Sequence, residues 1–222
     1  CNSACDSSLL EGNPIHEDMT EACAMLKPDF LLNTVFTPDG AVSEIVAGHW
    51  YEAWEKGCQD LLKMAGVKIK ELADVVIASA GGYPKDLNLY QSTKCHMNAA
   101  FAVKKGGIMI FTLDCEDIKE PAIFTDCFSR SNLEQFEKDI REAFTVPAFV
   151  AFKGRNILSD VTAYLVTRPE NFDFVKRTGH IPCATLEEAW SLAQAKLAKQ
   201  GKHDYTITIM GHGSATLPIL EQ

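Results

Sequence analysis

The sequence has no apolar run long enough to cross a membrane, and no segment gathers Lys and Arg into a basic stripe. Its longest apolar stretches, such as residues 73–80, fall far short of the roughly 18 residues that a membrane-spanning helix needs. The 222 residues include 21 basic and 30 acidic side chains, a formal charge of −9, which disfavours nucleic acid and anionic membranes. We therefore expect no nucleic-acid partner and no membrane partner.

The start of the sequence, Cys-Asn-Ser-Ala-Cys, also lacks an initiator Met, a basic leader and an apolar signal segment. We interpret the chain as part of a longer, cytoplasmic protein. Its 46% hydrophobic and 23% charged residues are typical of globular proteins. The length predicts a single domain over residues 1–222, with room for a small appendage.

Metal-ligand motifs are missing as well. The eight Cys residues include no Cys-x-x-Cys, and no two of the six His residues lie three or four positions apart. A self-contained metal site is therefore not expected, and scattered thiols in a chain of this size indicate a reducing compartment. Cys115 is the one thiol that we would test for reactivity, although a small buried hydrophobe is the favoured interpretation. We interpret the histidines as surface or hydrogen-bonded structural residues, namely His16, His49, His96, His180, His203 and His212.

The N-terminal part reads as a helix, a hairpin and a second helix. Asn13 and Pro14 predict the start of a helix over residues 14–26, with Met19, Cys23 and Leu26 on its apolar face. A Thr-Pro-Asp-Gly turn follows, and it predicts a β-hairpin between residues 30–36 and 41–46. Helical spacing of Trp and Leu residues then continues to about residue 64.

The remainder of the chain predicts an α/β fold. Short, almost unbroken apolar runs at 74–79, 107–113 and 205–210 are typical of strands covered on both faces. Capping boxes at 131–134 and 185–188 predict two helices, the first with Glu134–Lys138 and Glu137–Arg141 pairs on its solvent side. We predict three layers, with a mixed, mostly parallel sheet flanked by helices.

The segment after the strand at 74–79 holds the candidate site. It contains adjacent glycines, Gly81 and Gly82, and then Asp86, which we expect to cap the next helix. Loops at the carboxyl ends of such strands commonly bind ligands. The glycines fit neither the G-x-G-x-x-G dinucleotide motif nor the P-loop, so nucleotide binding is not indicated by pattern alone.

Gln91 and Lys94 are three residues apart at the predicted start of this helix. They would share one face near the positive end of the helix dipole, where an ammonium and an amide can hold a small carboxylate. Two solvated side chains would give the same pattern, so the spacing leaves both interpretations open.

The string from Ser79 to Lys94, with Gly-Gly-Tyr-Pro-Lys-Asp followed by Tyr-Gln-Ser-Thr-Lys, resembles the C-terminal half of the nickel-pincer lactate racemase family. Residues 10–19 are similar to the segment where that half begins. The resemblance implies a 2-hydroxy-acid racemase or epimerase that transfers hydride reversibly to a nicotinate-derived nickel-pincer mononucleotide. It further implies that Gln91, Lys94 and the neighbouring Tyr90 bind the substrate.

The same resemblance places the nickel ligands, the proton-transferring histidines and the cofactor-tethering Lys in an N-terminal domain that precedes Cys1. It therefore implies that this chain alone is inactive, with the N-terminal domain of the same protein as its partner. Two segments bear on the substrate. Residues 116–119 replace a glycine-containing turn of relatives, and residues 211–218 form either a cleft-lining loop or a structural turn.

Two alternative functions stay open at this level. The chain could be a stand-alone α/β module that binds a small anion or mononucleotide at Gly81–Gly82 without catalysis. A nicotinamide-dependent dehydrogenase is disfavoured, because the third glycine of the dinucleotide motif is missing. The sequence does not specify which 2-hydroxy acid is the substrate.

Overall fold

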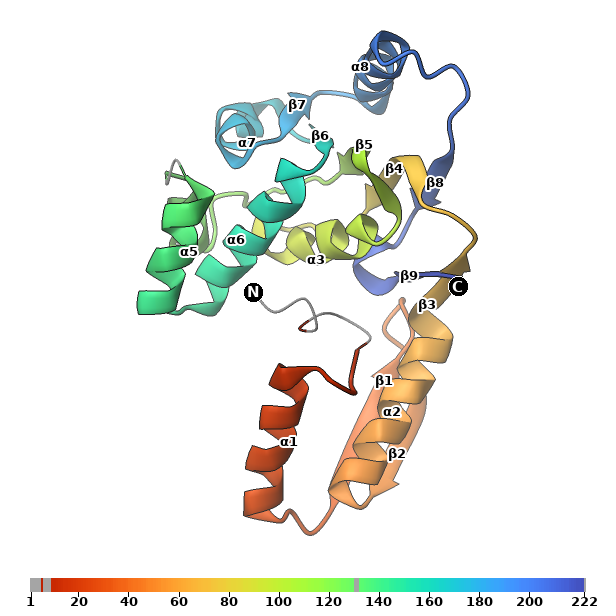
Figure 1. The fold of residues 1–222 in the computed structure, drawn as a ribbon, viewed down its shortest axis with the longest axis vertical. Coiled ribbons are helices and arrows are strands. Elements are labelled where there is room, and N and C mark those ends of the chain that lie inside the picture. The colour runs from red at the N-terminus through yellow and green to blue at the C-terminus, as the bar shows by residue number, and fades with distance from the viewer. Residues whose placement is uncertain (1–4, 6–8, 130–131, 222) are drawn as a thin grey trace. The chain divides into compact units, whose positions relative to one another are not determined.

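The computed structural model describes residues 5, 9–129 and 132–221, and it divides at Gly66/Val67 into two compact units. The first unit (Figure 1) contains a helix, a two-stranded antiparallel sheet and a second helix. Their bounds are α1 Pro14–Leu26, β1 Leu31–Phe36, β2 Val42–Gly48 and α2 Trp50–Ala65. The predicted helix at 14–26 and the predicted hairpin are thereby confirmed.

Only one side of the hairpin is packed within this unit. Val35 and Val46 are buried on the side that faces α2, where Val46 lies 3.4 Å from the position that a Cβ on Gly57 would occupy. The predicted apolar face of α1 is only partly packed within this unit. Met19 and Leu26 are 65% and 82% exposed, and Cys23 is half-buried. His16, two helical turns before Cys23 on the same side of the helix, stacks on Trp54 of α2.

The second unit is built on a five-stranded parallel sheet with the order β7-β6-β5-β4-β8. A separate two-stranded sheet pairs β3 with β9. The strands are β3 Gly66–Ile69, β4 Ala73–Ser79, β5 Val103–Thr112, β6 Thr162–Val166, β7 Ile181–Cys183, β8 Ile207–Met210 and β9 Leu217–Leu220. The helices are α3 Leu89–Ala100, α4 Ala122–Thr125, α5 Leu133–Glu142, α6 Val146–Ser159, α7 Phe172–Thr178 and α8 Leu186–Lys199, with 3₁₀ turns η1 Asp126–Ser129, η2 Pro169–Asn171 and η3 Gly213–Ala215.

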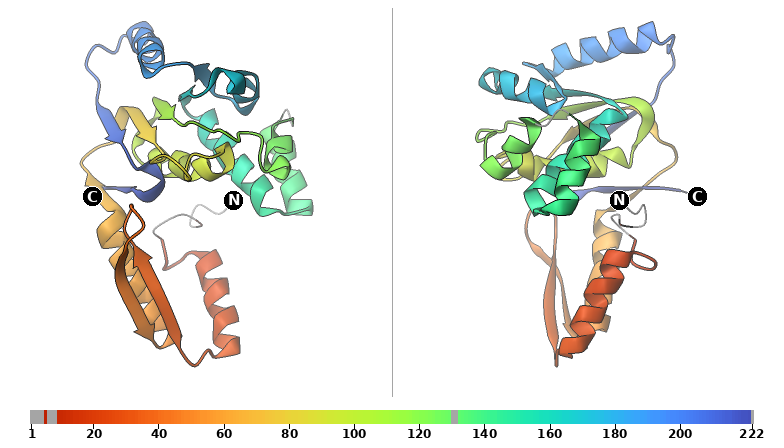
Figure 2. Two further views of the ribbon diagram at one scale, coloured as in Figure 1. Left: turned by 180° about the vertical axis from the view of Figure 1, so that it is seen from behind. Right: turned by 60° about the vertical axis from the view of Figure 1, so that its left-hand side comes forward.

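The sheet is covered on both faces, as its apolar strands require. On one face Val76 and Phe111 pack in a core with residues of α3, α4 and α6, and on the other Val75 and Ile110 pack against α8. Figure 2 shows α8 on one side of the sheet and α3 with α6 on the other. The three-layer α/β prediction is confirmed, and the five-stranded sheet is parallel throughout.

Helix starts follow the chemistry of capping, with one shift. Thr185 accepts a hydrogen bond from the backbone N–H of Glu188, as the second capping box predicts. The first box is wrong by one residue, because α5 is capped by Asn132, whose side chain accepts from Glu134 and Gln135. Asn132 therefore fulfils the role assigned to Ser131, which lies outside the described residues. Both predicted ion pairs on α5, Glu134–Lys138 and Glu137–Arg141, are present.

His96 of α3 forms a buried pair with His180. Nε2 of His96 lies 2.9 Å from Nε2 of His180, and Nδ1 of His96 lies 2.9 Å from the carbonyl oxygen of Ser92. That carbonyl can only accept, so it fixes the His96 proton on Nδ1 and leaves Nε2 to accept from His180. Burial lowers the pKa of His96 to about 4 and that of His180 well below 6.5. The pair is therefore neutral in the folded protein at neutral pH.

This pair predicts acid-sensitive stability. In the unfolded chain both imidazoles take up protons as the pH falls through about 6.5, whereas the folded chain resists protonation. The contribution of this pair to the free energy of unfolding is therefore fully present above about pH 6.5. It decreases as the pH falls toward 4, and the loss from His96 alone is roughly 3 kcal/mol, because its folded pKa is about 4. The check is the free energy of unfolding in urea, measured from pH 7.5 to 4.5.

A His96→Gln/His180→Gln variant provides the control for this prediction. It removes both titrations, so the pH slope in this window should flatten even if the variant is less stable at every pH. The same change at exposed His203 should leave the slope intact. Equal slopes in the wild type and the double variant would contradict the assignment.

Candidate functional site

The order of the strands identifies the end of the sheet where ligands of open α/β folds usually bind. The chain runs from β4 through β5 and β6 to β7 in one direction, and β8 then returns to the opposite side of β4. Ligands of open α/β sheets bind outside the carboxyl ends of the strands where the order reverses in this way. Here that point lies between β4 and β8, followed by residues 80–88 and 211–213.

Glycines allow these two segments to approach each other. Gly81 and Gly82 have φ of 102° and 78°, and a Cβ on Gly81 would lie 2.9 Å from Nδ1 of His212. A Cβ on Gly213 would lie 2.5 Å from Sγ of Cys95 on α3. The histidine His212 is thus held beside the Gly81–Gly82 loop, although no spacing in the sequence links the two.

The helix that carries Gln91 and Lys94 begins at Leu89, three residues after the predicted cap. The side chain of Asn88 caps it by accepting from the backbone N–H of Gln91 at 2.9 Å. The prediction for Asp86 is therefore wrong. Asp86 is buried, and its carboxylate accepts from the backbone N–H of Asp114 at 3.3 Å.

Gln91 and Lys94 meet on the outer side of this helix, in its first two turns. Nζ of Lys94 donates to Oε1 of Gln91 at 3.1 Å, and Lys94 is exposed while Gln91 is half-buried. This bond uses one of the two lone pairs of the amide oxygen, and the pair retains several N–H donors: the two remaining protons of the ammonium and the Gln91 amide N–H₂. N–H donors, one group of them charged, are suited to a carboxylate.

Tyr90, the third predicted site residue, lies on a different side of α3. Its ring packs edge-on against Phe124, with 5.4 Å between the ring centres, and it adjoins the hydrophobic core. It is half-buried, so it connects the core to the surface at the first turn of the helix. The structure thus brings Gln91 and Lys94 into contact and gives Tyr90 a packing role beside them.

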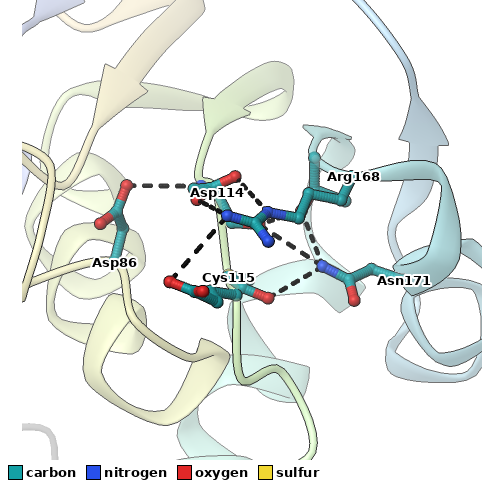
Figure 3. A network of polar contacts seen from close by, with 7 residues as sticks. Asp86, Asp114, Cys115, Arg168 and Asn171 are labelled. Carbon is teal, nitrogen blue, oxygen red and sulfur yellow. Dashed lines mark hydrogen bonds and ion pairs between the residues drawn. The ribbon is translucent and has the colours of Figure 1, made fainter.

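A network of polar contacts connects the loops that follow β4, β5 and β6 (Figure 3). Arg168 forms two parallel hydrogen bonds with the carboxylate of Asp114, at 2.7 and 2.6 Å, and this guanidinium lowers the pKa of Asp114. The side chain of Asn171 donates to the carbonyl oxygen of Cys115 at 2.9 Å, and the backbone N–H of Cys115 donates to the carbonyl oxygen of Asp86. Arg168 and Asn171 follow β6, a strand that our reading of the sequence missed.

Cys115 belongs to this network through its backbone, and its thiol is buried. Burial raises the pKa of the thiol to about 12, so it is protonated and unreactive at neutral pH. The residue adopts φ of 50°, a left-handed conformation that favours glycine. The interpretation of Cys115 as a small buried hydrophobe is confirmed.

The described residues contain neither a cluster of metal ligands nor a membrane-spanning helix. Within residues 5, 9–129 and 132–221, no three His, Cys, Asp or Glu side chains lie close enough together to hold a metal ion. No disulfide joins the cysteines that the structure describes. None of the described helices has the length and apolar character needed to span a membrane.

The contact between Gly81 and His212 predicts a graded effect of adding a methyl group. Gly81→Ala and Gly82→Ala should each destabilise the protein by roughly 1–2 kcal/mol, because both residues have positive φ. Gly81→Ala should lower the free energy of unfolding more, since its Cβ must displace His212 while that of Gly82 meets nothing within 4 Å. In a His212→Gly background the two substitutions should be equally destabilising. Thermal unfolding of the four variants measures this, and equal costs in the wild-type background would refute the contact.

Comparison with known proteins connects this geometry to a family. Residues 68–217 match the family model of the lactate racemase C-terminal domain. The lactate racemase of Thermoanaerobacterium thermosaccharolyticum is 31% identical over 201 residues, which cover 88% of this chain and 47% of that protein. The lactate racemase of Lactiplantibacillus plantarum is 32% identical over 105 residues, or 47% of this chain and 24% of that protein. This chain thus spans about half or less of the length of these relatives.

Solved structures agree. The lactate racemase apoprotein from T. thermosaccharolyticum superposes with a TM-score of 0.87 at 28% identity, covering all of this chain and 52% of that one. A Thermotoga maritima protein shares the fold alone, with a TM-score of 0.62 at 15% identity over 94% of this chain and 54% of its own. The resemblance noted in the Gly-Gly-Tyr-Pro-Lys-Asp segment is confirmed, and the chain belongs to the lactate racemase C-terminal domain family.

Proposed function

We propose that residues 1–222 are the substrate-contacting C-terminal domain of an isomerase that racemises or epimerises a small 2-hydroxy acid of the lactate type. The observation that carries this proposal is the Gln91–Lys94 pair. It lies on the exposed side of α3, directly after the β4 loop, in a chain of the lactate racemase C-terminal domain family.

In this proposal Lys94 binds the substrate carboxylate and Gln91 orients it. The ammonium retains two donors beyond its bond to Gln91, and the Gln91 amide nitrogen supplies a third group that can reach the same anion. A hydrogen bond between charged partners contributes about 1.5–3 kcal/mol. The start of α3 adds the positive end of its dipole.

The supporting residues hold this pair in place. Asn88 fixes the first turn of α3 by capping it, and Tyr90 anchors the same turn to Phe124 in the core. Cys95 and Ala99, on the inward side of the helix, are fully buried. A helix fixed at its cap and along its inner side keeps both donors in position before the substrate arrives, as a binding site requires.

The proposal assigns the metal chemistry to a part of the protein outside these 222 residues. The resemblance implies a nickel-pincer mononucleotide and reversible hydride transfer, but the described residues provide no donor set for nickel. The proposal assigns that cofactor to an N-terminal domain of the same protein, and it follows that the 222-residue chain alone does not racemise 2-hydroxy acids. The absence of disulfides among the described cysteines supports a cytoplasmic location.

Removing the charge at Lys94 should weaken catalysis in the complete enzyme. Lys94→Ala is expected to lower kcat/KM at least about tenfold, the loss expected for one charged contact of about 1.5 kcal/mol. The assay is the interconversion of D- and L-lactate, with each enantiomer as the starting substrate. Both directions should slow by the same factor, because the carboxylate is common to the two enantiomers.

Lys105→Ala is the matched control, since Lys105 is also exposed and pairs with Asp160 on a different element. It should leave kcat/KM unchanged. Lys94→Arg, which retains the charge, should recover part of the loss. Wild-type kinetics in Lys94→Ala would remove Lys94 from the substrate site, and no interconversion of lactate or any other 2-hydroxy acid by the nickel-loaded complete protein would refute the function.

A further inference from the structure

The hairpin of the first unit has an apolar face that is mostly exposed within that unit, although Thr34 and Phe36 also line a cavity beside α2. We call it the outer face and define it by residues on one side of the two strands: Leu32, Thr34 and Phe36 of β1, and Val42, Ile45 and Ala47 of β2, with a register shift between the Phe36–Val42 pair and the other two pairs. The strand register pairs them directly, Leu32 with Ala47, Thr34 with Ile45 and Phe36 with Val42. None of the six is charged.

The four large side chains of this face are exposed. Leu32, Phe36, Val42 and Ile45 are 67%, 54%, 53% and 65% exposed, while Val35 and Val46 on the opposite side are buried. An antiparallel sheet with one solvated face alternates apolar and polar residues. The outer face breaks that rule, so its sequence is that of a sheet covered on both sides.

The family comparisons indicate what covers it. The model of the lactate racemase C-terminal domain begins at residue 68, and the structure divides at Gly66/Val67, so the hairpin lies outside that domain by two independent criteria. The match to the T. thermosaccharolyticum enzyme nevertheless covers 88% of the chain. Residues 67–222 are a smaller fraction of the chain than this, so the match extends into the first unit. That relative contains about as much polypeptide again beyond the matched part.

We propose that the outer face of the β1–β2 hairpin is the docking surface for the N-terminal half of the same protein, the half that this 222-residue chain does not include. This inference rests on the proposed function, because the proposed function requires that such an N-terminal half exists. It assigns residues 9–66 to the body formed with the N-terminal half, and residues 67–222 to the substrate-contacting domain. A second copy of the chain, or residues 67–222, are the competing occupants.

Oxidative footprinting of side chains tests the proposal on two proteins, the 222-residue chain and the complete translation product of its gene. Leu32, Phe36 and Ile45 should be labelled at least about fivefold more slowly in the complete protein. Leu192 on α8, which is 41% exposed, should be labelled equally in both and serves as the internal control. Sedimentation of both samples identifies dimers.

A pair of adjacent substitutions supplies the second measurement. Ile45→Lys places a lysine on the outer face. Glu44→Lys places a lysine at the neighbouring position, which pairs with Val35 and lies on the opposite face of the hairpin. In the 222-residue chain both variants should unfold at the wild-type temperature, because both side chains are exposed. In the complete protein Ile45→Lys should lower the Tm and speed proteolysis between the halves, and Glu44→Lys should do neither.

Three results would overturn the proposal: equal labelling of the outer face in the two proteins, protection already present in the 222-residue chain through a dimer or residues 67–222, or a reading frame with no N-terminal half. These results are separable from the function. A complete protein whose outer face is protected but which racemises no hydroxy acid would retain the docking surface and reject the proposed activity.

Discussion

The position of the candidate site depends on a set of hydrogen bonds that join the loops after β4, β5 and β6. Asp86 accepts from the main chain of Asp114, Arg168 pairs with the Asp114 carboxylate, and Asn171 donates to the carbonyl of Cys115. Each contact joins segments far apart in the sequence, so together they fix where the β4 loop ends and α3 begins. The exposed Asp114–Arg168 pair adds little stability by itself, since solvent screens it. Its contribution is geometric, because it limits the conformations that the loops can adopt.

The parts of the fold that the sequence predicted are those determined locally. The helix at 14–26 follows from the Asn13–Pro14 start, the hairpin follows from its Thr-Pro-Asp-Gly turn, and the ion pairs of α5 follow from i,i+4 spacing. The central strands were found because parallel strands buried on both faces need nearly unbroken apolar runs. The contact between Gln91 and Lys94 was likewise predictable, since it lies within one helix.

The missed features depend on contacts across the chain. Asp86 has the chemistry of a helix cap, but a competing main-chain donor at Asp114 engages it, and Asn88 caps α3 instead. His96 and His180 are separated by 84 residues, so no spacing rule detects their pairing. His212 meets the Gly81 loop only because β8 pairs with β4, a neighbour relation that the sequence pattern does not specify. Tertiary context decides each of these cases.

The N–H donors that the Gln91–Lys94 pair retains are consistent with the reaction that we propose. A racemase must stabilise the transition state from either enantiomer, so groups that contact the chiral carbon or its hydroxyl from one side would favour one hand. The carboxylate is the part of a 2-hydroxy acid that both enantiomers share. Lys94 and Gln91 both retain N–H donors for that carboxylate after bonding to each other. In the proposal these donors hold the group that the two enantiomers share, and the stereochemical step is assigned to groups outside this chain.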